Sequence, residues 1–217
     1  MSVLEVPSLV GRVVRLEPLH TAHVDQLVAA ASEDRATYDF AVVSGDTTAM
    51  MAQVEGLLRD FDAGLVVPFV QVDVAANRLV GMTRYLTIRT RPHATTPFAV
   101  EIGGTWLAAS AQRSGINTEA KFLLLRHAFE VWRVARVDLK TDNRNERSKA
   151  AIARIGASFE GVLRQWQPSQ VVGEETRYRD SAMFSIIDAE WPALRSRFES
   201  LMEPLGGGHR GVTSRLG

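Results

Sequence analysis

The sequence contains no cysteine among its 217 residues. This absence excludes a cysteine nucleophile, a thiolate metal cluster and a disulfide framework, and it is typical of a reducing compartment. No apolar run approaches the ~20 residues that a membrane-spanning helix needs. The first ten residues also lack the basic segment and apolar core of a signal peptide. We therefore expect a cytoplasmic protein with no membrane partner.

An excess of charge of one sign is also absent, because 25 Lys and Arg residues balance 25 Asp and Glu residues. This balance removes the simplest electrostatic argument for nucleic-acid or membrane-surface binding. A small anionic cofactor is not excluded, since local donors can hold it. A chain of this length can bury roughly 70% of its extended surface, enough for one good core. We expect one domain and no nucleic-acid partner.

The five histidines do not form a metal-binding pattern. His20 and His23 lie beside Asp25 near the start of a predicted helix, but no third ligand follows at helical spacing. The sequence also has no Gly-x-Ser-x-Gly motif. Without this motif and without cysteine, a covalent acyl-enzyme is not expected. We predict no metal site.

Hydrophobic periodicity and turn residues predict an alternating series of strands and helices. The expected strands are 13–18, 66–74, 79–88, 98–107, 135–141, 158–167 and 177–187, and the expected helices are 21–32, 47–63, 118–132, 146–155 and 190–202. Residues 89–97 are predicted to be a loop. This order favours an α/β domain over residues 1–204, with a mixed central sheet of about seven strands and helices on both faces. A disordered tail is expected over residues 205–217.

The most informative motif runs from Gln112 to Ala120 and reads Gln-Arg-Ser-Gly-Ile-Asn-Thr-Glu-Ala. It joins an apolar strand-like run to a strongly helical run. A Gly-bearing turn that enters a helix gathers unpaired N–H groups and the positive end of the helix dipole. Such a turn suits phosphate or pyrophosphate, so the sequence predicts a phosphorylated cofactor near Gly115. The alternative is an ordinary turn in which Thr118 starts the helix.

Three further motifs accompany this loop, namely Glu101-Ile102-Gly103, Trp106-Leu107 and Asn145-Glu146-Arg147-Ser148. Together with the loop they resemble the GNAT N-acetyltransferase superfamily, over about residues 8–195. Within it, residues 11–19 and the late Tyr178-Arg179-Asp180 are typical of the branch that acetylates the N-terminal residue of ribosomal proteins. The resemblance implies a GNAT-like fold, acetyl-CoA as the cofactor, and an amine as the acetyl acceptor.

The superfamily's acetyl-CoA loop has the form Gln/Arg-x-x-Gly-x-Gly/Ala. Gln112 and Gly115 match its first and fourth positions, whereas Asn117 replaces the small sixth residue. Many members also carry Gly where Arg113 stands and an aromatic residue where Gly104 stands. Arg113 could add charge against phosphate, and Asn117 tolerates unusual backbone angles. The residues that we predict to contact the cofactor are Trp106, Leu107, Ala108, Gln112, Arg113, Ser114, Gly115, Ile116, Asn117, Thr118, Asn145 and Ser148.

Glu101 is the best candidate for a catalytic base, because it is an isolated carboxylate in a largely apolar strand. Partial burial favours the neutral form of a carboxylate, so Glu101 could accept a proton near neutral pH. The alternative is a Glu on a solvated strand face, or one paired with an Arg such as Arg84. Asp142 and Glu119 are weaker candidates for the same role.

Ser148 is the candidate for a general acid. It shares one helical face with Ala151, Ile152 and Ile155, so its hydroxyl is expected to point inward. The resemblance places Asn145 near the pantetheine arm and Ser148 near the cofactor sulfur, where a hydroxyl could donate to the departing thiolate. The structural alternative is that Asn145 caps the helix and Ser148 satisfies its first turn.

The resemblance leaves two hypotheses about function. The preferred one is an N-acetyltransferase that moves an acetyl group to a primary amine, on a small molecule or a peptide N-terminus, by direct transfer in a ternary complex. The alternative is a non-catalytic module with the GNAT fold that binds acyl-CoA. Trp106, Trp166, Tyr38 and Tyr178 could line the acceptor pocket. We also consider a homodimer, because two-fold dimers are common among soluble proteins.

Overall fold

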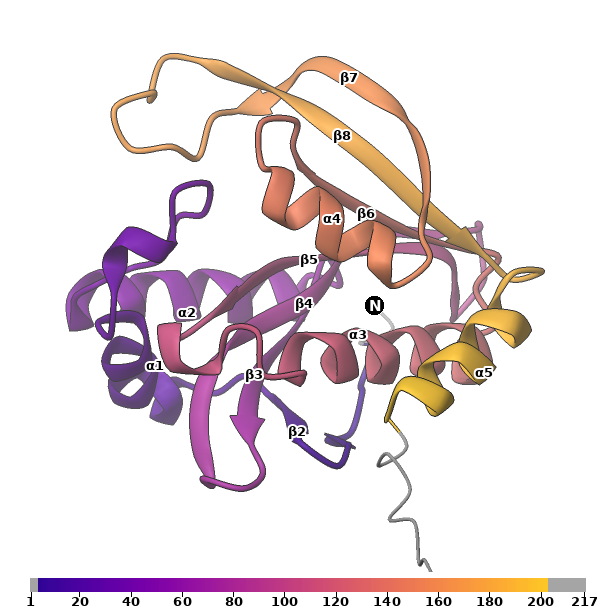
Figure 1. Ribbon diagram of the computed structural model, residues 1–217, viewed down its shortest axis with the longest axis horizontal. Coiled ribbons are helices and arrows are strands. Elements are labelled where there is room, and N and C mark those ends of the chain that lie inside the picture. The colour runs from indigo at the N-terminus through magenta and orange to yellow at the C-terminus, as the bar shows by residue number, and fades with distance from the viewer. Residues whose placement is uncertain (1–3, 203–217) are drawn as a thin grey trace, which may run out of the picture.

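A computed structural model describes residues 4–202, which form one domain around an eight-stranded sheet (Figure 1). The strands are β1 (Leu9–Val10), β2 (Val14–Pro18), β3 (Val67–Asp73), β4 (Arg78–Thr90), β5 (Pro97–Leu107), β6 (Arg136–Asp142), β7 (Ser158–Pro168) and β8 (Tyr178–Ile187). Their order across the sheet is β1-β2-β3-β4-β5-β6-β8-β7. The β5–β6 pair is parallel and the other neighbouring pairs are antiparallel, so the sheet is mixed.

Within the described residues, five α-helices accompany the sheet, namely α1 (Val24–Ala31), α2 (Thr47–Asp62), α3 (Ile116–Arg126), α4 (Glu146–Arg154) and α5 (Trp191–Met202). Short 3-10 turns lie at Thr21–His23, Arg35–Thr37 and Ala109–Ala111, and α3 continues into a π-helical turn at His127–Val131. No helix within residues 4–202 is both long enough and apolar enough to cross a lipid bilayer.

The predicted α/β architecture with a mixed sheet is confirmed, with three local corrections. The sheet has eight strands because the two-residue β1 pairs with β2, and two residues are too few to produce a periodic pattern. The predicted loop 89–97 is shorter, since β4 extends to Thr90 and β5 begins at Pro97. The helix predicted from Thr118 begins at Ile116. The tail predicted over 205–217 lies outside the described residues.

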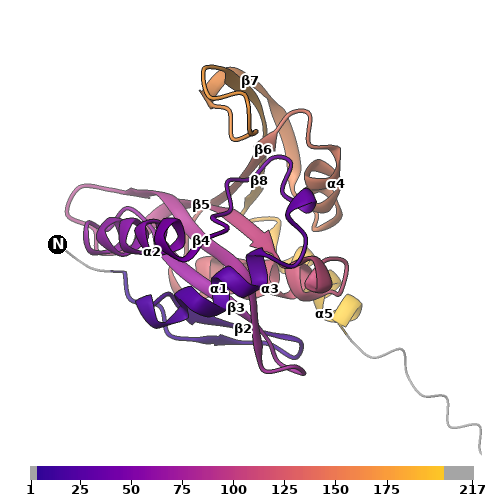
Figure 2. The ribbon, with the colours of Figure 1, turned by 90° about the vertical axis from the view of Figure 1, so that its left-hand side faces the viewer.

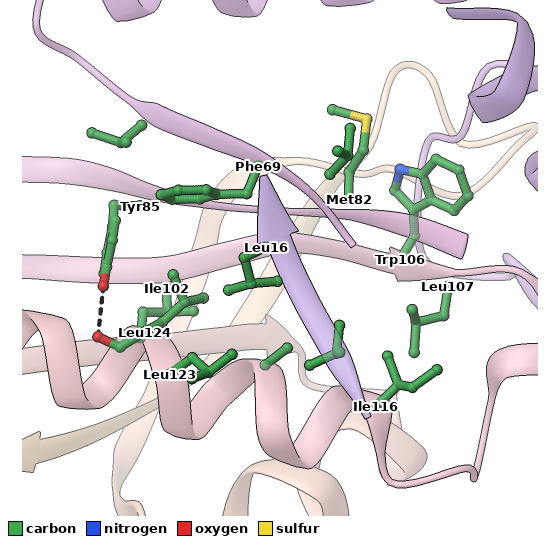
Figure 3. Close-up of a cluster of buried hydrophobic side chains, with 14 of the residues drawn as sticks. Leu16, Phe69, Met82, Tyr85, Ile102, Trp106, Leu107, Ile116, Leu123 and Leu124 are labelled. Atoms are coloured by element: carbon green, nitrogen blue, oxygen red, sulfur yellow. Dashed lines mark hydrogen bonds between the residues drawn. The ribbon is translucent and has the colours of Figure 1, made fainter. Parts of the chain in front are cut away.

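Helices cover both faces of the sheet (Figures 1 and 2). Figure 3 shows Leu16, Tyr85, Ile102 and Leu107 between the sheet and α3, while Met82 and Trp106 point to the other side. Tyr85 is fully buried, and its hydroxyl donates to the Leu124 carbonyl at 2.6 Å. Buried polar groups need such partners, so this bond fixes the position of α3 against β4.

The most important feature for function is the short pairing between β5 and β6. Only Ala99, Val100 and Glu101 of β5 pair with β6, at Arg136, Val137 and Asp138. Beyond Glu101 the two strands diverge. Just past this point β5 contains a bulge, where Gly104 adopts a left-handed φ of 56°. Within residues 4–202, the edge of β5 from Ile102 to Leu107 therefore has no strand partner on its β6 side.

Glu119, a weaker candidate for the base, has a structural role. Its carboxylate accepts main-chain N–H groups of Arg12, Val13 and Val14 at 2.8, 2.7 and 2.9 Å. It is buried, and a Cβ at Gly11 would lie only 2.5 Å from it. The side chain thus fastens the start of β2 to α3, and we withdraw it as a catalytic candidate.

Replacing Glu119 by alanine is predicted to destabilise the fold. The change leaves three N–H groups of the β1–β2 turn without their acceptor, so we expect a loss of about 3 kcal/mol in the free energy of unfolding. Chemical denaturation measures it. Glu55→Ala, on the exposed face of α2, is the control and should change stability by less than about 0.5 kcal/mol. Equal effects of both changes would contradict the anchoring role.

Candidate functional site

The loop that enters α3 contains two residues with left-handed backbone. Arg113 has φ 62° and Gly115, the N-cap of α3, has φ 88°. A Cβ at Gly115 would meet nothing within 4 Å, so backbone conformation rather than space favours glycine there. Asn117, which would tolerate such angles, lies inside the first turn of α3, and Arg113 adopts the left-handed conformation instead.

Six successive N–H groups, from Arg113 to Thr118, have no hydrogen-bond acceptor within residues 4–202. They lie at the N-terminal end of α3, where the helix dipole adds positive potential. Ser114, Gly115 and Thr118 line a cavity of about 410 Å³. Arg154 and Arg197 also line it, and neither has an ion-pair partner in the described part of the chain. The free donors and the positive potential are the features on which the predicted anion site depends, and the site itself stays a prediction.

The end of β5 leads directly into this loop. The Leu107 carbonyl accepts hydrogen bonds from the Tyr38 hydroxyl at 3.3 Å and from Gln112 Nε2 at 3.1 Å. The Ala108 N–H donates to the Val80 carbonyl at 2.7 Å. Because this amide is already used within the sheet, it is not free to stabilise a developing oxyanion. The predicted cofactor contacts of Trp106 and Leu107 stay predictions.

Glu101 lies where β5 and β6 begin to diverge, and only 4% of its surface is exposed. One carboxylate oxygen, Oε2, accepts from Lys140 Nζ at 2.8 Å and from the Thr87 hydroxyl at 3.0 Å. The other, Oε1, has no hydrogen-bond partner among the described residues. A Cβ at Gly103 would come within 3.2 Å of Oε1, so the glycine keeps this oxygen accessible. Glu101 is neither solvated nor paired with Arg84, the two alternatives from sequence.

Asn145 caps α4, because its Oδ1 accepts the Ser148 N–H at 2.9 Å. Ser148 is half-buried, and its hydroxyl makes no hydrogen bond within residues 4–202. The capping alternative is therefore confirmed for Asn145. The free hydroxyl of Ser148 is also compatible with the predicted acid role, and the two roles coexist.

Arg147, for which the sequence pattern predicts no separate role, connects three parts of the site. Its guanidinium donates to Gln112 Oε1 at 3.2 Å and to the Thr37 carbonyl at 3.0 Å. These bonds join the start of α4 to the loop that enters α3 and to the segment between α1 and α2. Only the folded chain reveals this role, because the two partners lie 35 and 110 residues away.

Comparison with known proteins now gives the family. The family model for the acetyltransferase (GNAT) domain matches residues 14–158. The chain belongs to the GNAT acetyltransferase family. A solved GCN5-related N-acetyltransferase from Brucella melitensis is 30% identical, with a TM-score of 0.79, and the match covers 93% of this chain and 88% of that one. No protein with a curated description matches the sequence.

Two more distant GNAT structures share the fold and contain coenzyme A. RimJ from Mycobacterium smegmatis, solved with CoA-disulfide, is 22% identical with a TM-score of 0.72, and the match covers 87% of this chain and 88% of that one. RimL, a ribosomal L7/L12 alpha-N-protein acetyltransferase solved with coenzyme A, is 21% identical with a TM-score of 0.68. That match covers 84% of this chain and 99% of RimL.

A second cavity of this GNAT domain, also about 410 Å³, lies beneath the β7–β8 hairpin and is lined by Asp142, Arg144, Tyr178 and Arg179 among others. Of the four aromatic residues predicted for an acceptor pocket, only Tyr178 lines this cavity. Tyr38 and Trp106 pack edge-to-face beside Leu107, with ring centroids 5.9 Å apart. Trp166 is 52% exposed on β7.

Asp142, the other weak candidate for the base, is held as an anion. Burial favours its neutral form, but hydrogen bonds from Arg144 prevail and lower the pKa of Asp142. The guanidinium contacts both carboxylate oxygens, at 3.0 and 2.7 Å. Such a bidentate pair is poorly suited to accept a proton near neutral pH. Residues 4–202 contain no cluster of three His, Asp or Glu side chains that could hold a metal ion.

Lys121 is a buried cationic residue that the sequence analysis missed. It points from α3 toward β5, and its Nζ donates to the Thr105 hydroxyl at 2.6 Å. Burial lowers the pKa of Lys121 to about 7, although the nearby Glu101 opposes the shift. An apolar helical stripe gives no signal for such a residue.

The stability difference between Lys121→Met and the parent chain is predicted to depend on pH. The unfolded chain keeps the Lys121 proton up to about pH 10, whereas the folded chain loses it near pH 7. The parent chain therefore gains stability as pH rises above 7, and the variant lacks this gain. We expect the stability of the variant relative to the parent to fall by about 2 kcal/mol between pH 7 and 9.

Urea denaturation at several pH values measures this difference. Lys149→Met, on the surface of α4, is the control, because its amine is within reach of water and bonds Glu146 at 2.7 Å. The stability difference between Lys149→Met and the parent chain should change little with pH. A flat difference for Lys121→Met would contradict the buried, readily deprotonated amine.

Proposed function

We propose that this GNAT domain is an N-acetyltransferase that moves the acetyl group of acetyl-CoA to a primary amine, by direct transfer in a ternary complex. The observation that carries the proposal is the free row of N–H groups from Arg113 to Thr118, placed at the end of the unpaired edge of β5. N–H groups that have no acceptor in the protein can donate to the oxygens of a diphosphate. RimJ and RimL, which share the fold, were solved with coenzyme A compounds, and this supports the same cofactor here.

The cofactor would be held in three places. The N–H groups of Ser114, Gly115 and Ile116 and their neighbours would bind the diphosphate, and Arg154 and Arg197 would attract the remaining phosphate charge. The edge of β5 at Trp106 and Leu107 would hold the pantetheine arm, near Asn145. When bound, acetyl-CoA supplies an activated acetyl group, so the task of the protein is mainly to position the amine.

Two side chains would handle protons. Glu101 accepts the amine proton on its free Oε1, while Lys140 and Thr87 fix the carboxylate through Oε2. The amine nitrogen then joins the acetyl carbon as the carbon–sulfur bond breaks. The hydroxyl of Ser148 provides a proton for the departing sulfur and regains one from water.

The acceptor is a small amine or a protein N-terminus. The name of RimL describes an alpha-N-protein acetyltransferase, which supports a protein N-terminus. A second candidate function is a non-catalytic acyl-CoA-binding module. The Glu101–Lys140 ion pair favours it, because the pair already occupies one oxygen of the carboxylate, at 2.8 Å.

Glu101→Gln is predicted to abolish turnover while acetyl-CoA binding is retained. The amide keeps the shape of the side chain but cannot accept a proton, so we expect the rate of CoA release to fall about 10²- to 10⁴-fold. CoA release is assayed with peptides, amino acids and polyamines, and binding by isothermal titration. Binding without turnover of any amine by the parent chain would support the module and contradict the enzyme.

Thr118→Asp is predicted to weaken acetyl-CoA binding without harming the fold. An Asp in the first turn of α3 suits the helix dipole, but it sets a negative charge beside the diphosphate site. We expect at least a tenfold rise in Kd, about 1.4 kcal/mol. Thr48→Asp, in the exposed first turn of α2, is the matched control and should leave Kd within about twofold. If Thr118→Asp binds acetyl-CoA as tightly as the parent chain, the cofactor does not bind at this loop.

A further inference from the structure

Arg179 is a buried cation in the cavity beneath the β7–β8 hairpin, and only 7% of its surface is exposed. Its Nε donates to the Ser181 hydroxyl at 3.3 Å and its Nη1 to Gln170 Oε1 at 3.4 Å. Both partners are neutral, and both bonds are long. No carboxylate within residues 4–202 forms an ion pair with Arg179. Most of its five N–H donors are therefore left for a ligand.

The acidic residues of the same cavity are occupied by other groups. Asp142 is paired with Arg144 at 2.7 Å. Glu174 is paired with Arg144 at 2.8 Å and with Arg177 at 3.3 Å. Asp180 is exposed at the rim, and its Oδ1 accepts the Gln165 N–H at 2.8 Å. Within this lining, Arg179 is the charged side chain that is both buried and without a counter-charge in contact.

Strand β6 links this cavity to the proposed base, because Asp142 of the lining lies two residues after Lys140, which donates to Glu101 at 2.8 Å. Arg179 interacts electrostatically with Glu101, and burial lowers the pKa of Arg179 while Asp142 and Glu101 oppose that shift. Arg84 approaches Glu101 from β4, and its buried Nε has no hydrogen-bond partner in the described chain. Its guanidinium lies against Gly104, where a Cβ would come within 2.5 Å. Two guanidinium groups without ion pairs in the described chain therefore interact electrostatically with the proposed base.

A buried guanidinium without a counter-charge is costly to the fold. A bound carboxylate removes this cost, because its two oxygens match the planar donors of arginine. The cavity of about 410 Å³ has the size of a small-molecule site.

We propose that the acceptor carries a carboxylate within a few bonds of its amine, and that Arg179 binds this carboxylate. The acceptor class is then a free amino acid, or a peptide with Asp or Glu at its first or second position. This inference rests on the proposed acetyl transfer, and it adds the specificity of that site. Arg179 acts here as a specificity-determining residue that positions the amine near Glu101.

The test uses acceptors that differ only in a carboxylate. The first set compares free amino acids with the corresponding amino-acid amides. The second set uses tripeptide amides and compares Glu-Ala-Ala with Gln-Ala-Ala, and Ala-Glu-Ala with Ala-Gln-Ala. In one of the two sets, we expect the acceptor with the carboxylate to have at least a tenfold higher kcat/KM than its amide partner. The set in which this occurs shows whether the acceptor is a free amino acid or a peptide. Arg179→Gln should remove this preference mainly by raising KM, with the slow amide substrates changed less than about twofold.

Three outcomes would overturn the inference. They are equal rates for carboxylate and amide partners, a preference for the amides, and an equal loss on both by Arg179→Gln, which would indicate a structural role. Arg179→Lys, which keeps the charge, should retain part of the preference. Arg164→Gln, the same change at an exposed position on β7, should have no effect. Thermal unfolding checks that each variant is folded.

Failure of acetyl transfer itself has a different signature. If acetyl-CoA binds but no acceptor releases CoA, the proposed activity is wrong. The carboxylate probes are then titrated into the CoA complex by calorimetry. The inference is supported if the probe with the carboxylate binds and Arg179→Gln weakens this binding at least tenfold. Equal binding of the carboxylate probe and its amide partner overturns it.

Discussion

The site depends on the early separation of two parallel strands. β5 and β6 share three residue pairs and then part, so one edge of β5 is left without a neighbour in the middle of the sheet. Backbone donors and acceptors rarely stay unpaired inside a protein. In the function that we propose, a ligand with its own amide groups completes this edge. The same separation sets Glu101 at the closed end of the gap and the start of α3 at the open end.

Few of the charged side chains around this gap form a complete ion pair. Lys140 neutralises Glu101 through one oxygen, and the second oxygen is left beside Gly103. Lys121 has only a hydroxyl as its partner on the opposite face of the sheet. Arg84 and Arg179 have no ion-pair partner in the described chain. Buried charges of this kind destabilise a fold unless a ligand or a function offsets them, and in our proposal the substrates offset them.

Much of the fold and part of the site can be predicted from the sequence, where the signal is local. Gly115 before a helical run specifies the anion loop, and Asn145 three residues before Ser148 specifies a helix cap. Glu101 stands out as a carboxylate in an apolar strand. Each of these features is encoded within a few neighbouring residues.

The rest depends on contacts between distant residues, which the sequence pattern does not show. Glu119 resembled a possible base, but it binds the β1–β2 turn more than 100 residues away. The Ala108 amide is used by Val80. Lys121 lies on a helix that looks like simple core packing, and the partners of Arg147 and Arg179 come from other elements.

The central claim is that main-chain amides from Arg113 to Thr118 hold the diphosphate of acetyl-CoA. Amide chemical shifts in ¹⁵N NMR spectra, followed during titration with acetyl-CoA and with acetyl-pantetheine, test it most directly. Our account predicts that acetyl-CoA moves the signals of Gly115 to Thr118 most, and that acetyl-pantetheine, which lacks the diphosphate, leaves them nearly unchanged. Saturable binding of acetyl-CoA with these six amides unmoved would contradict it.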